Sequence, residues 1–335
     1  MRLQRHQGGE AQADRLDLAQ LALLADRLPL SDRTRDALAD LAPRGVIEGL
    51  SWRWEGVASD PRRYQLKARV KGLSLSPSGE PGQGRPGLGG ADVTVQATET
   101  GGSAELAVRD GWLGFPGVFE EPRIELDSLN ANVRWTVQPP AKEGAPSRWQ
   151  VEVRQARFAN SEAAGQLEGT WRTGETTADR LPGHLELRGS LSRAQATAVW
   201  RYLPLTVGDA ARQYVRHAIR GGIGQDVTFE VIGGLDGFPF PNDQGGRFRV
   251  KVPVREASLD YAPAAITGDA PGVRWTPFTD MAGELAFEGQ RMVIRQAHGR
   301  LGDHSLVARL PHGAHPAVGE MLPLRAQPGR LHFFD

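Results

Sequence analysis

The chain has 335 residues, enough for two domains or for one elongated domain. Its 40 basic and 40 acidic residues give a formal net charge of zero, which argues against nucleic acid as the main partner because phosphate binding needs a basic excess. The absence of cysteine excludes a disulfide framework and a thiolate nucleophile or metal site. The 41 glycines and 23 prolines favour short strands joined by many turns.

The start of the chain is polar, and we expect residues 1–14 to be disordered. This segment lacks the apolar core of a signal peptide, and no later stretch is apolar for long enough to span a bilayer. The chain as it stands is therefore expected to be soluble. Helices are predicted over residues 16–24 and 33–41, because Pro29 interrupts the helical pattern and Pro43 ends it.

After residue 43 the chain alternates sharply between apolar and polar residues. The alternation is clearest at 66–71, 93–97, 133–137, 149–154, 185–188, 247–252 and 284–288. Parallel strands buried on both faces would be apolar throughout, so this pattern predicts a mainly β chain with antiparallel strands and one wet face. About fifteen such strands at ~4.8 Å spacing would make a sheet about 70 Å wide. One continuous sheet of that width would exceed the usual limit of ~10 strands unless it curls.

The apolar face of such a sheet needs a covering. One helix is ~10 Å across and covers about two strands, so the few predicted helices shield only a minority of them. The rest either packs sheet on sheet as a closed sandwich or curls into an open trough. A trough lined by Val, Leu and Ala offers almost no hydrogen-bonding groups and suits acyl chains. The alternation alone favours the closed sandwich.

The segment 200–240 combines a helix, a glycine turn and a strand. The helix has one apolar stripe formed by Ala211, Tyr214, Val215, Ala218 and Ile219. Asp209 can cap its start, and we expect it to end at Gly221-Gly222 with Arg220 in its last turn. The helix is predicted to dock on the edge of a sheet.

The same order of features occurs near the start of the chain. Leu28-Pro29-Leu30, followed by a glycine turn at Gly45, echoes Leu203-Pro204-Leu205, followed by Gly221. We interpret this as two copies of one large unit, each a helical segment leading into strands. The predicted organisation is a disordered segment at 1–14, a first unit at 15–189 and a second unit at 190–335.

Several short motifs occur in an order that resembles a known family. They are Tyr202-Leu203-Pro204, Gly237-Phe238-Pro239-Phe240, Gly246-Arg247-Phe248-Arg249-Val250, Leu259-Asp260-Tyr261 and Phe287-Glu288-Gly289-Gln290-Arg291-Met292, with Pro43-Arg44-Gly45-Val46-Ile47 and residues 112–122 upstream. Together they look like the central region of the YhdP family, which are AsmA-like envelope proteins of Gram-negative bacteria. The resemblance covers most of residues 16–310.

The resemblance implies a bridge-like carrier. Family members are anchored in the inner membrane by one N-terminal helix and extend across the periplasm. A long curled antiparallel sheet, of the repeating β-groove type, carries phospholipid along its hydrophobic groove toward the outer membrane. This favours the open trough over the closed sandwich. The family's membrane helix is missing here, and Tyr214-Val215 stands where the family has a Trp-Leu pair.

No motif predicts catalysis. The chain has no GxSxG, P-loop or nucleotide fingerprint, and acidic pairs such as Glu120-Glu121 fall on the charged outer face. His312 and His315 have a two-histidine spacing, but they lie between prolines without a third ligand nearby, as in a solvated loop. We therefore expect no enzyme, no cofactor and no metal.

The leading hypothesis is a segment of a phospholipid carrier at the periplasmic face of the inner membrane. Its partners would be phospholipid acyl chains and, through the missing anchor, the inner membrane. The groove lining is predicted at the positions with the cleanest alternation after the helix: Val227, Phe229, Val231, Phe248, Val250 and Val252. Arg212, Arg216 and Arg220 are candidate headgroup contacts at the rim, unless they only form a water-exposed helix end. The alternative is a structural or protein-interaction module of two closed β-sandwiches.

Overall fold

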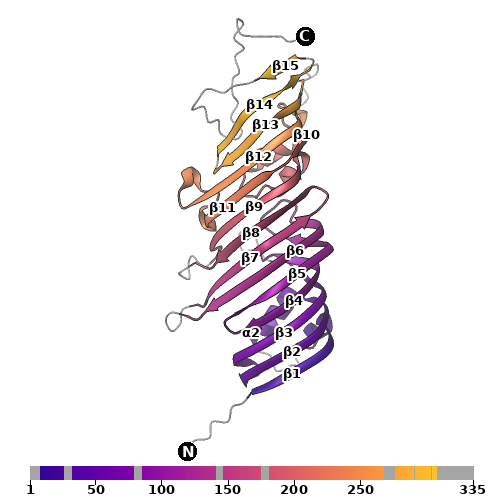
Figure 1. Cartoon of the computed structure of the whole chain (residues 1–335), viewed down its shortest axis with the longest axis vertical. Coiled ribbons are helices and arrows are strands. Elements are labelled where there is room, and N and C mark those ends of the chain that lie inside the picture. The colour runs from indigo at the N-terminus through magenta and orange to yellow at the C-terminus, as the bar shows by residue number, and fades with distance from the viewer. Residues whose placement is uncertain are drawn as a thin grey trace, which may run out of the picture. The chain divides into compact units, whose positions relative to one another are not determined.

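The structure is a computed structural model that describes residues 8–25, 32–78, 85–140, 146–174, 181–267, 276–289, 291–302 and 304–307. It is mainly β, with antiparallel strands and a few short helices, as the alternation predicted (Figure 1). The chain divides into two compact units. The first comprises Met1–Ser161 and Gln166–Leu185, and the second comprises Glu162–Gly165 and Glu186–Asp335.

The strands of the first unit follow one another in chain order. They are β1 (Gly8–Asp17), β2 (Arg44–Val57), β3 (Asp60–Leu75), β4 (Gly87–Thr98), β5 (Gly101–Gly114), β6 (Arg123–Gln138), β7 (Arg148–Ala159) and most of β8 (Ala163–Arg172). From β1 to β7 each strand pairs antiparallel with the next. Figure 1 shows the strands of this unit bowing, so that its sheet curls.

The prediction of disorder over residues 1–14 is wrong for residues 8–14, which form most of β1. Ala11 and Ala13 alternate with polar residues there, and Ala11 pairs with Trp52 of β2. This pairing joins residues far apart in the sequence, so the polar composition of the segment does not reveal it. Residues 1–7 lie outside the described residues.

Two helices, α1 (Leu18–Leu23) and α2 (Asp32–Leu41), lie where the sequence predicted them. Asp17 caps α1 by accepting a hydrogen bond from the backbone N–H of Gln20 at 3.0 Å. At the end of α2, the carbonyl of Leu41 accepts from the N–H of Ser76 at 2.8 Å. Both helices therefore lie where β2 begins and β3 ends. We call this long side of the unit, where β4 and β6 also begin, the helical edge.

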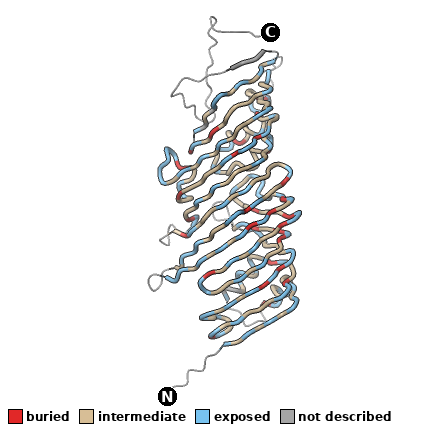
Figure 2. Tube along the Cα trace, viewed as in Figure 1, coloured by how far each residue is buried: buried red, intermediate tan, exposed pale blue. Residues whose placement is uncertain are grey.

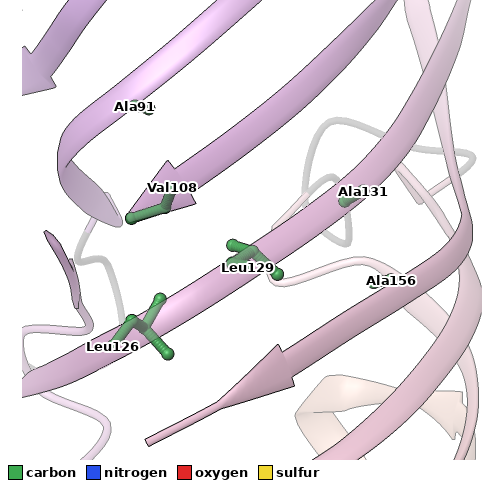
Figure 3. Close-up of a cluster of buried hydrophobic side chains, with 6 residues drawn as sticks. All are labelled: Ala91, Val108, Leu126, Leu129, Ala131 and Ala156. Carbon is green, nitrogen blue, oxygen red and sulfur yellow. The ribbon is translucent and has the colours of Figure 1, made fainter. Parts of the chain in front are cut away.

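The buried core of the first unit lies toward the helical edge. It consists of Ala91, Val108, Leu126, Leu129, Ala131 and Ala156, on the neighbouring strands β4 to β7 (Figure 3). A second cluster of Ile47, Ala68 and Val70 packs against Leu16 and Leu18, at the start of α1. Figure 2 shows the buried residues of β4 to β6 gathered toward one end of these strands.

The second unit is built around its longest strand, β12. Its strands are β9 (His184–Gln195), β10 (Ile219–Gly224), β11 (Val227–Gly234), β12 (Gly246–Leu259), β13 (Phe278–Glu288), β14 (Arg291–Leu301) and β15 (His304–Val307). On one side of β12, β10 and β11 pair with different halves of the strand. On the other side β13, β14 and β15 follow in antiparallel order.

The central helix α3 (Asp209–Ala218) is shorter than predicted. It ends at Ala218, and Gly221-Gly222 lies inside β10 instead of capping the helix. Ile219 already has an extended backbone, with φ −83° and ψ 112°. A Cβ added at Gly222 would lie 3.0 Å from Cα of Ala257 on β12, so the glycine is needed for a close approach between strands. Arg220 is consequently a strand residue.

Short helical segments complete the second unit. They are η2 (Ala196–Tyr202), η3 (Leu235–Gly237), η4 (Pro241–Asp243) and α4 (Ala264–Thr267). Helix α3 contacts η2, α4 and β10. The N–H of Asp260 donates to the carbonyl of Ala218 at 2.7 Å. The helix therefore lies at one end of β10 and β12, which agrees with the predicted docking at a sheet edge.

Candidate functional site

Apolar side chains form continuous rows across the sheet of the first unit. One row runs Ala68, Val95, Ala104, Val133 and Val153, each residue directly opposite the next on β3 to β7. Residues directly opposite in antiparallel strands project from the same face. The neighbouring row, Lys67, Gln96, Ser103, Arg134 and Glu152, is polar and projects from the other face. The sheet thus has one apolar face and one charged face.

Burial along the apolar face changes from one edge to the other. Toward the helical edge Ala91 is 0% exposed and Val108 is 1% exposed. Farther from that edge, Val95, Val133 and Val153 are only half-buried, and Trp149 is 40% exposed. The half of the apolar face away from the helices is therefore partly open, as in a trough and unlike a closed sandwich.

In the second unit the six predicted groove residues occupy β11 and β12. Phe229 lies opposite Val250, and Val231 lies opposite Phe248. Val250 in turn faces Phe287, and Val252 faces Leu285, both on β13. The structure thus brings these positions onto one apolar face. Val227 is buried and the other five are half-buried. Their contact with lipid stays a prediction.

A phenylalanine cluster covers one end of this second face. Phe238 contacts Phe248 with ring centroids 5.1 Å apart, and Phe238 and Phe240 meet edge to face at 5.9 Å. Phe240 is fully buried. Its ring lies against Gly246, where an added Cβ would come within 2.5 Å of it. The segment containing η3 and η4 therefore folds back over the Val231 and Phe248 end of the face.

The three arginines predicted at the rim have different environments. Arg212 is buried, and its guanidinium donates to the carbonyls of Leu205 at 3.2 Å and Val207 at 2.9 Å and to Oδ1 of Asp209 at 3.0 Å. Arg216 is exposed and lies 4.1 Å above the ring of Trp200. Arg220 is exposed and pairs with Asp260 at 3.6 Å. Arg212 thus holds the loop before α3 in place, whereas the other two side chains reach the surface.

The charged face of the second unit carries cross-strand ion pairs. Glu230 of β11 accepts from Arg188 of β9 at 3.0 Å and from Arg247 of β12 at 3.2 Å. Glu284 of β13 pairs with Lys251 at 2.8 Å and with Arg295 at 3.1 Å. The hydrogen bond from Arg188 lowers the pKa of Glu230, and the bond from Lys251 lowers the pKa of Glu284. These pairs link neighbouring strands without contacting the apolar face.

Within the described ranges, no group of three or more His, Asp or Glu side chains is placed to hold a metal ion. His312 and His315 lie outside these ranges. None of the helices that the structure describes has the length and apolarity needed to cross a membrane.

Trp52, Trp54 and Trp171 of the first unit are functional candidates that sequence reasoning missed. The alternation predicts Trp135 and Trp149 as core aromatics that in a trough would also contact lipid, and neither is fully buried. One available signal was the repeated pairing of an aromatic residue with an arginine, as in Trp52-Arg53-Trp54, Arg148-Trp149 and Trp171-Arg172.

Fold and site together define a class of protein: a mainly β chain whose curling antiparallel sheet has one half-exposed apolar face and one charged face. A family model described as YhdP protein matches residues 1–308. The chain belongs to the YhdP family, which confirms the resemblance of its motifs.

Curated relatives match only a short stretch. The sn-glycerol-3-phosphate import ATP-binding protein UgpC of Burkholderia thailandensis is 54% identical over 39 residues. The protein of the same name from Burkholderia mallei is 51% identical over 39 residues. Each match covers 12% of this chain and 11% of the relative, so it carries no argument about the whole chain. No solved structure matches.

Proposed function

We propose that this chain is a segment of a periplasmic bridge-like carrier that moves phospholipid from the inner to the outer membrane along its apolar face, without catalysis. The half-exposed rows of Val, Ala and Leu carry the proposal. Membership of a family of bridge-like envelope lipid carriers supports it. The proposal includes anchoring in the inner membrane, which the family resemblance implies.

The apolar face suits acyl chains for an energetic reason. Each CH2 group taken out of water contributes about 0.8 kcal/mol, so a single lipid tail gains on the order of 10 kcal/mol when it is covered on all sides. The face has few groups that could recognise a polar ligand, and its rows are continuous across several strands. On a surface of this kind the binding energy of an acyl tail depends on the apolar area that it covers. Few directional contacts hold the tail in place, so it is free to slide along the face.

The second candidate, a structural module of closed β-sandwiches, predicts a different burial pattern. In a sandwich the inner faces of two sheets interdigitate and become fully buried. Phe229, Val250 and Val252 are instead half-buried in the second unit. This observation favours the carrier.

The direct test is extraction of the purified chain and mass spectrometry of the extract. The carrier predicts phospholipid in stoichiometric amount. Val250→Glu should lower that amount several-fold while the chain stays folded by circular dichroism, because a half-exposed Glu keeps much of its hydration. Thr228→Glu is the matched control, since Thr228 lies on the charged face opposite Lys251.

Two outcomes would contradict the carrier. The first is that no phospholipid is extracted and that Val250→Glu changes neither the extract nor the folding of the chain. Unfolding by Val250→Glu, with Thr228→Glu unaffected, would instead show that residue 250 lies in a closed core.

A further inference from the structure

Six aromatic residues gather along the side of the first unit opposite the helical edge. They are Trp52 and Trp54 on β2, Tyr64 on β3, Trp135 on β6, Trp149 on β7 and Trp171 on β8. All of them lie toward the ends of strands where β2, β4 and β6 finish and β3, β5 and β7 begin. We call this side the aromatic edge.

Strand pairing places these rings on the apolar face. Trp54 lies opposite Tyr64, and Trp52 lies opposite Leu66. Trp135 faces Val151, and Val137 faces Trp149. The N–H of Thr173 donates to the carbonyl of Trp149 at 3.0 Å, which puts Trp171, two residues before Thr173, on the same face. Trp112 differs, because it lies on the charged face under Arg123, 4.8 Å away.

Three of the indole rings lie close to a glycine of a neighbouring strand or turn. A Cβ added at Gly9 would come within 2.5 Å of the Trp54 ring, one at Gly102 within 2.4 Å of the Trp135 ring, and one at Gly183 within 3.0 Å of the Trp171 ring. Aromatic rings commonly cover strand glycines in this way. The rings therefore line the floor of the trough at this edge without filling it.

Most of these indoles retain hydrogen-bonding capacity. Trp171 donates its ring N–H to the carbonyl of Pro182 at 2.9 Å. Among the described contacts, no acceptor faces the ring N–H of Trp52, Trp54, Trp135 or Trp149, and these side chains are not fully buried. Rings with an apolar body and one polar N–H concentrate at the interfacial level of lipids, between the tails and the water.

Three of the rings have an exposed arginine as their sequence neighbour, which projects from the charged face at the same strand ends. Arg63 precedes Tyr64, Arg148 precedes Trp149 and Arg172 follows Trp171, and all three arginines are exposed. Within the described part of the chain none of the three has an ion-pair partner. Guanidinium groups bind phosphate through two parallel hydrogen bonds. The aromatic edge thus combines an amphipathic lining on the apolar face with cations on the charged face of the same strand ends.

We propose that the aromatic edge of the first unit binds the glycerol-ester and phosphate end of a glycerophospholipid, whose acyl chains run across the apolar face toward the helical edge. The inference rests on the proposed function and adds an orientation to it. The tails lie on the half-buried aliphatic residues between the two edges, such as Val133 and Val153, which offer no polar group. The aromatic edge suits the esters and phosphate, because it offers ring N–H groups on the apolar face and guanidiniums at the same strand ends.

The absence of cysteine makes this orientation measurable. Single-cysteine variants Val137→Cys, at the aromatic edge, and Leu106→Cys, about six residues or ~20 Å closer to the helical edge, can each carry one fluorophore. The chain is loaded with phosphatidylglycerol that has a nitroxide either on its headgroup or at the end of one tail. We expect the headgroup label to quench residue 137 at least about threefold more than residue 106 over this ~20 Å separation, and the tail label to reverse the order. Equal quenching at both positions, or the opposite order, overturns the proposal.

Substitution of the rings gives an independent readout. Trp135→Phe and Trp149→Phe keep the aromatic body and remove the N–H, and Trp112→Phe on the charged face is the matched control. We expect the double variant to retain about three- to tenfold less phosphatidylglycerol, in line with the loss of one or two hydrogen bonds, and to retain palmitate unchanged. Equal loss of both lipids, or no loss of either, contradicts a role at the ester and phosphate end.

Three outcomes distinguish this proposal from membrane docking and from the proposed function. If the double variant loses binding to intact phosphatidylglycerol vesicles but keeps its extracted lipid, the edge docks membranes and the orientation within the trough is wrong. If the wild-type chain contains no lipid and takes up none, the proposed function fails and the orientation falls with it. If lipid is bound but quenching is uniform, only the orientation fails.

Discussion

Among single residues, Arg212 gives the sharpest test of the predicted headgroup contacts, because the structure places its side chain inside the protein. Its guanidinium is buried and donates to two carbonyls and one carboxylate, all in the loop and first turn that precede it. Arg212→Ala leaves these acceptors without their donor, so we expect the unfolding free energy to fall by about 2–4 kcal/mol. Urea denaturation of the purified chain measures this loss.

The control for this prediction is Arg216→Ala. Arg216 is exposed above Trp200, and such a cation–π contact contributes about 0.5–1 kcal/mol. Both variants should retain wild-type amounts of phospholipid. A variant at 212 that stays fully stable and loses lipid would show that Arg212 is a headgroup contact after all.

The sequence predicted which side chains share a face, but not how far each is buried. Alternation placed Phe229 and Val250 together correctly, because a strand has a period of two residues whatever its surroundings. Arg212 read as a solvated residue because arginines are mostly exposed. Its acceptors are backbone carbonyls of Leu205 and Val207, and only the folding of the loop back onto α3 brings them within reach.

At the scale of elements, helix existence was predictable and helix ends were less so. Proline at 43 ended α2 as expected. Gly221-Gly222 looked like a helix end, because glycine serves both helix caps and close strand contacts. Which use applies depends on Ala257 of β12, a residue distant in sequence. The strand β1 was missed for the same reason, since its pairing with β2 is a long-range contact.

The ion pairs that join β12, β13 and β14 predict a pH dependence. The hydrogen bond from Lys251 to Glu284, reinforced by Arg295, lowers the pKa of Glu284 below its ordinary value of 4.5. A lowered folded-state pKa stabilises the fold at pH values above the ordinary pKa, and that contribution is lost as the pH falls through the lowered value. Stability should therefore decline on acidification below about pH 4.5.

Glu284→Gln tests this dependence. The variant should be less stable than the wild type at pH 7, and the difference should shrink as the pH falls below 4.5. Thermal unfolding at a series of pH values measures both effects. Glu105→Gln is the control, since Glu105 has no ion pair among the described contacts. A difference between Glu284→Gln and the wild type that stays constant with pH would refute the linkage.

For the whole molecule, the sequence predicted an antiparallel sheet. It did not show whether a second sheet covers the apolar face or whether that face is open. Alternation with one charged face requires antiparallel strands, and the strand order bears this out. The same alternation is compatible with a closed sandwich, which it favours, and with an open trough, because the two differ in what covers the apolar face and not in which residues form it. Val133 and Val250 are half-buried, which indicates an open face. Their degree of burial depends on the curl of the sheet and on how few helices cover it.

An apolar face that is covered by lipid makes the stability of the folded chain depend on lipid. A ligand at 100 times its Kd adds about 2.7 kcal/mol to the folded state, which for a chain of this size raises Tm by about 4 °C. We therefore expect delipidated protein to melt lower than lipid-loaded protein by this margin and to bind a hydrophobic dye. Refilling with phosphatidylglycerol should reverse both changes.

Val250→Glu should reduce the rise in Tm, and Thr228→Glu should leave it intact. If Tm is the same with and without lipid and no dye binds, protein side chains already cover the apolar face. A large exposed apolar surface would change at least one of these two measurements.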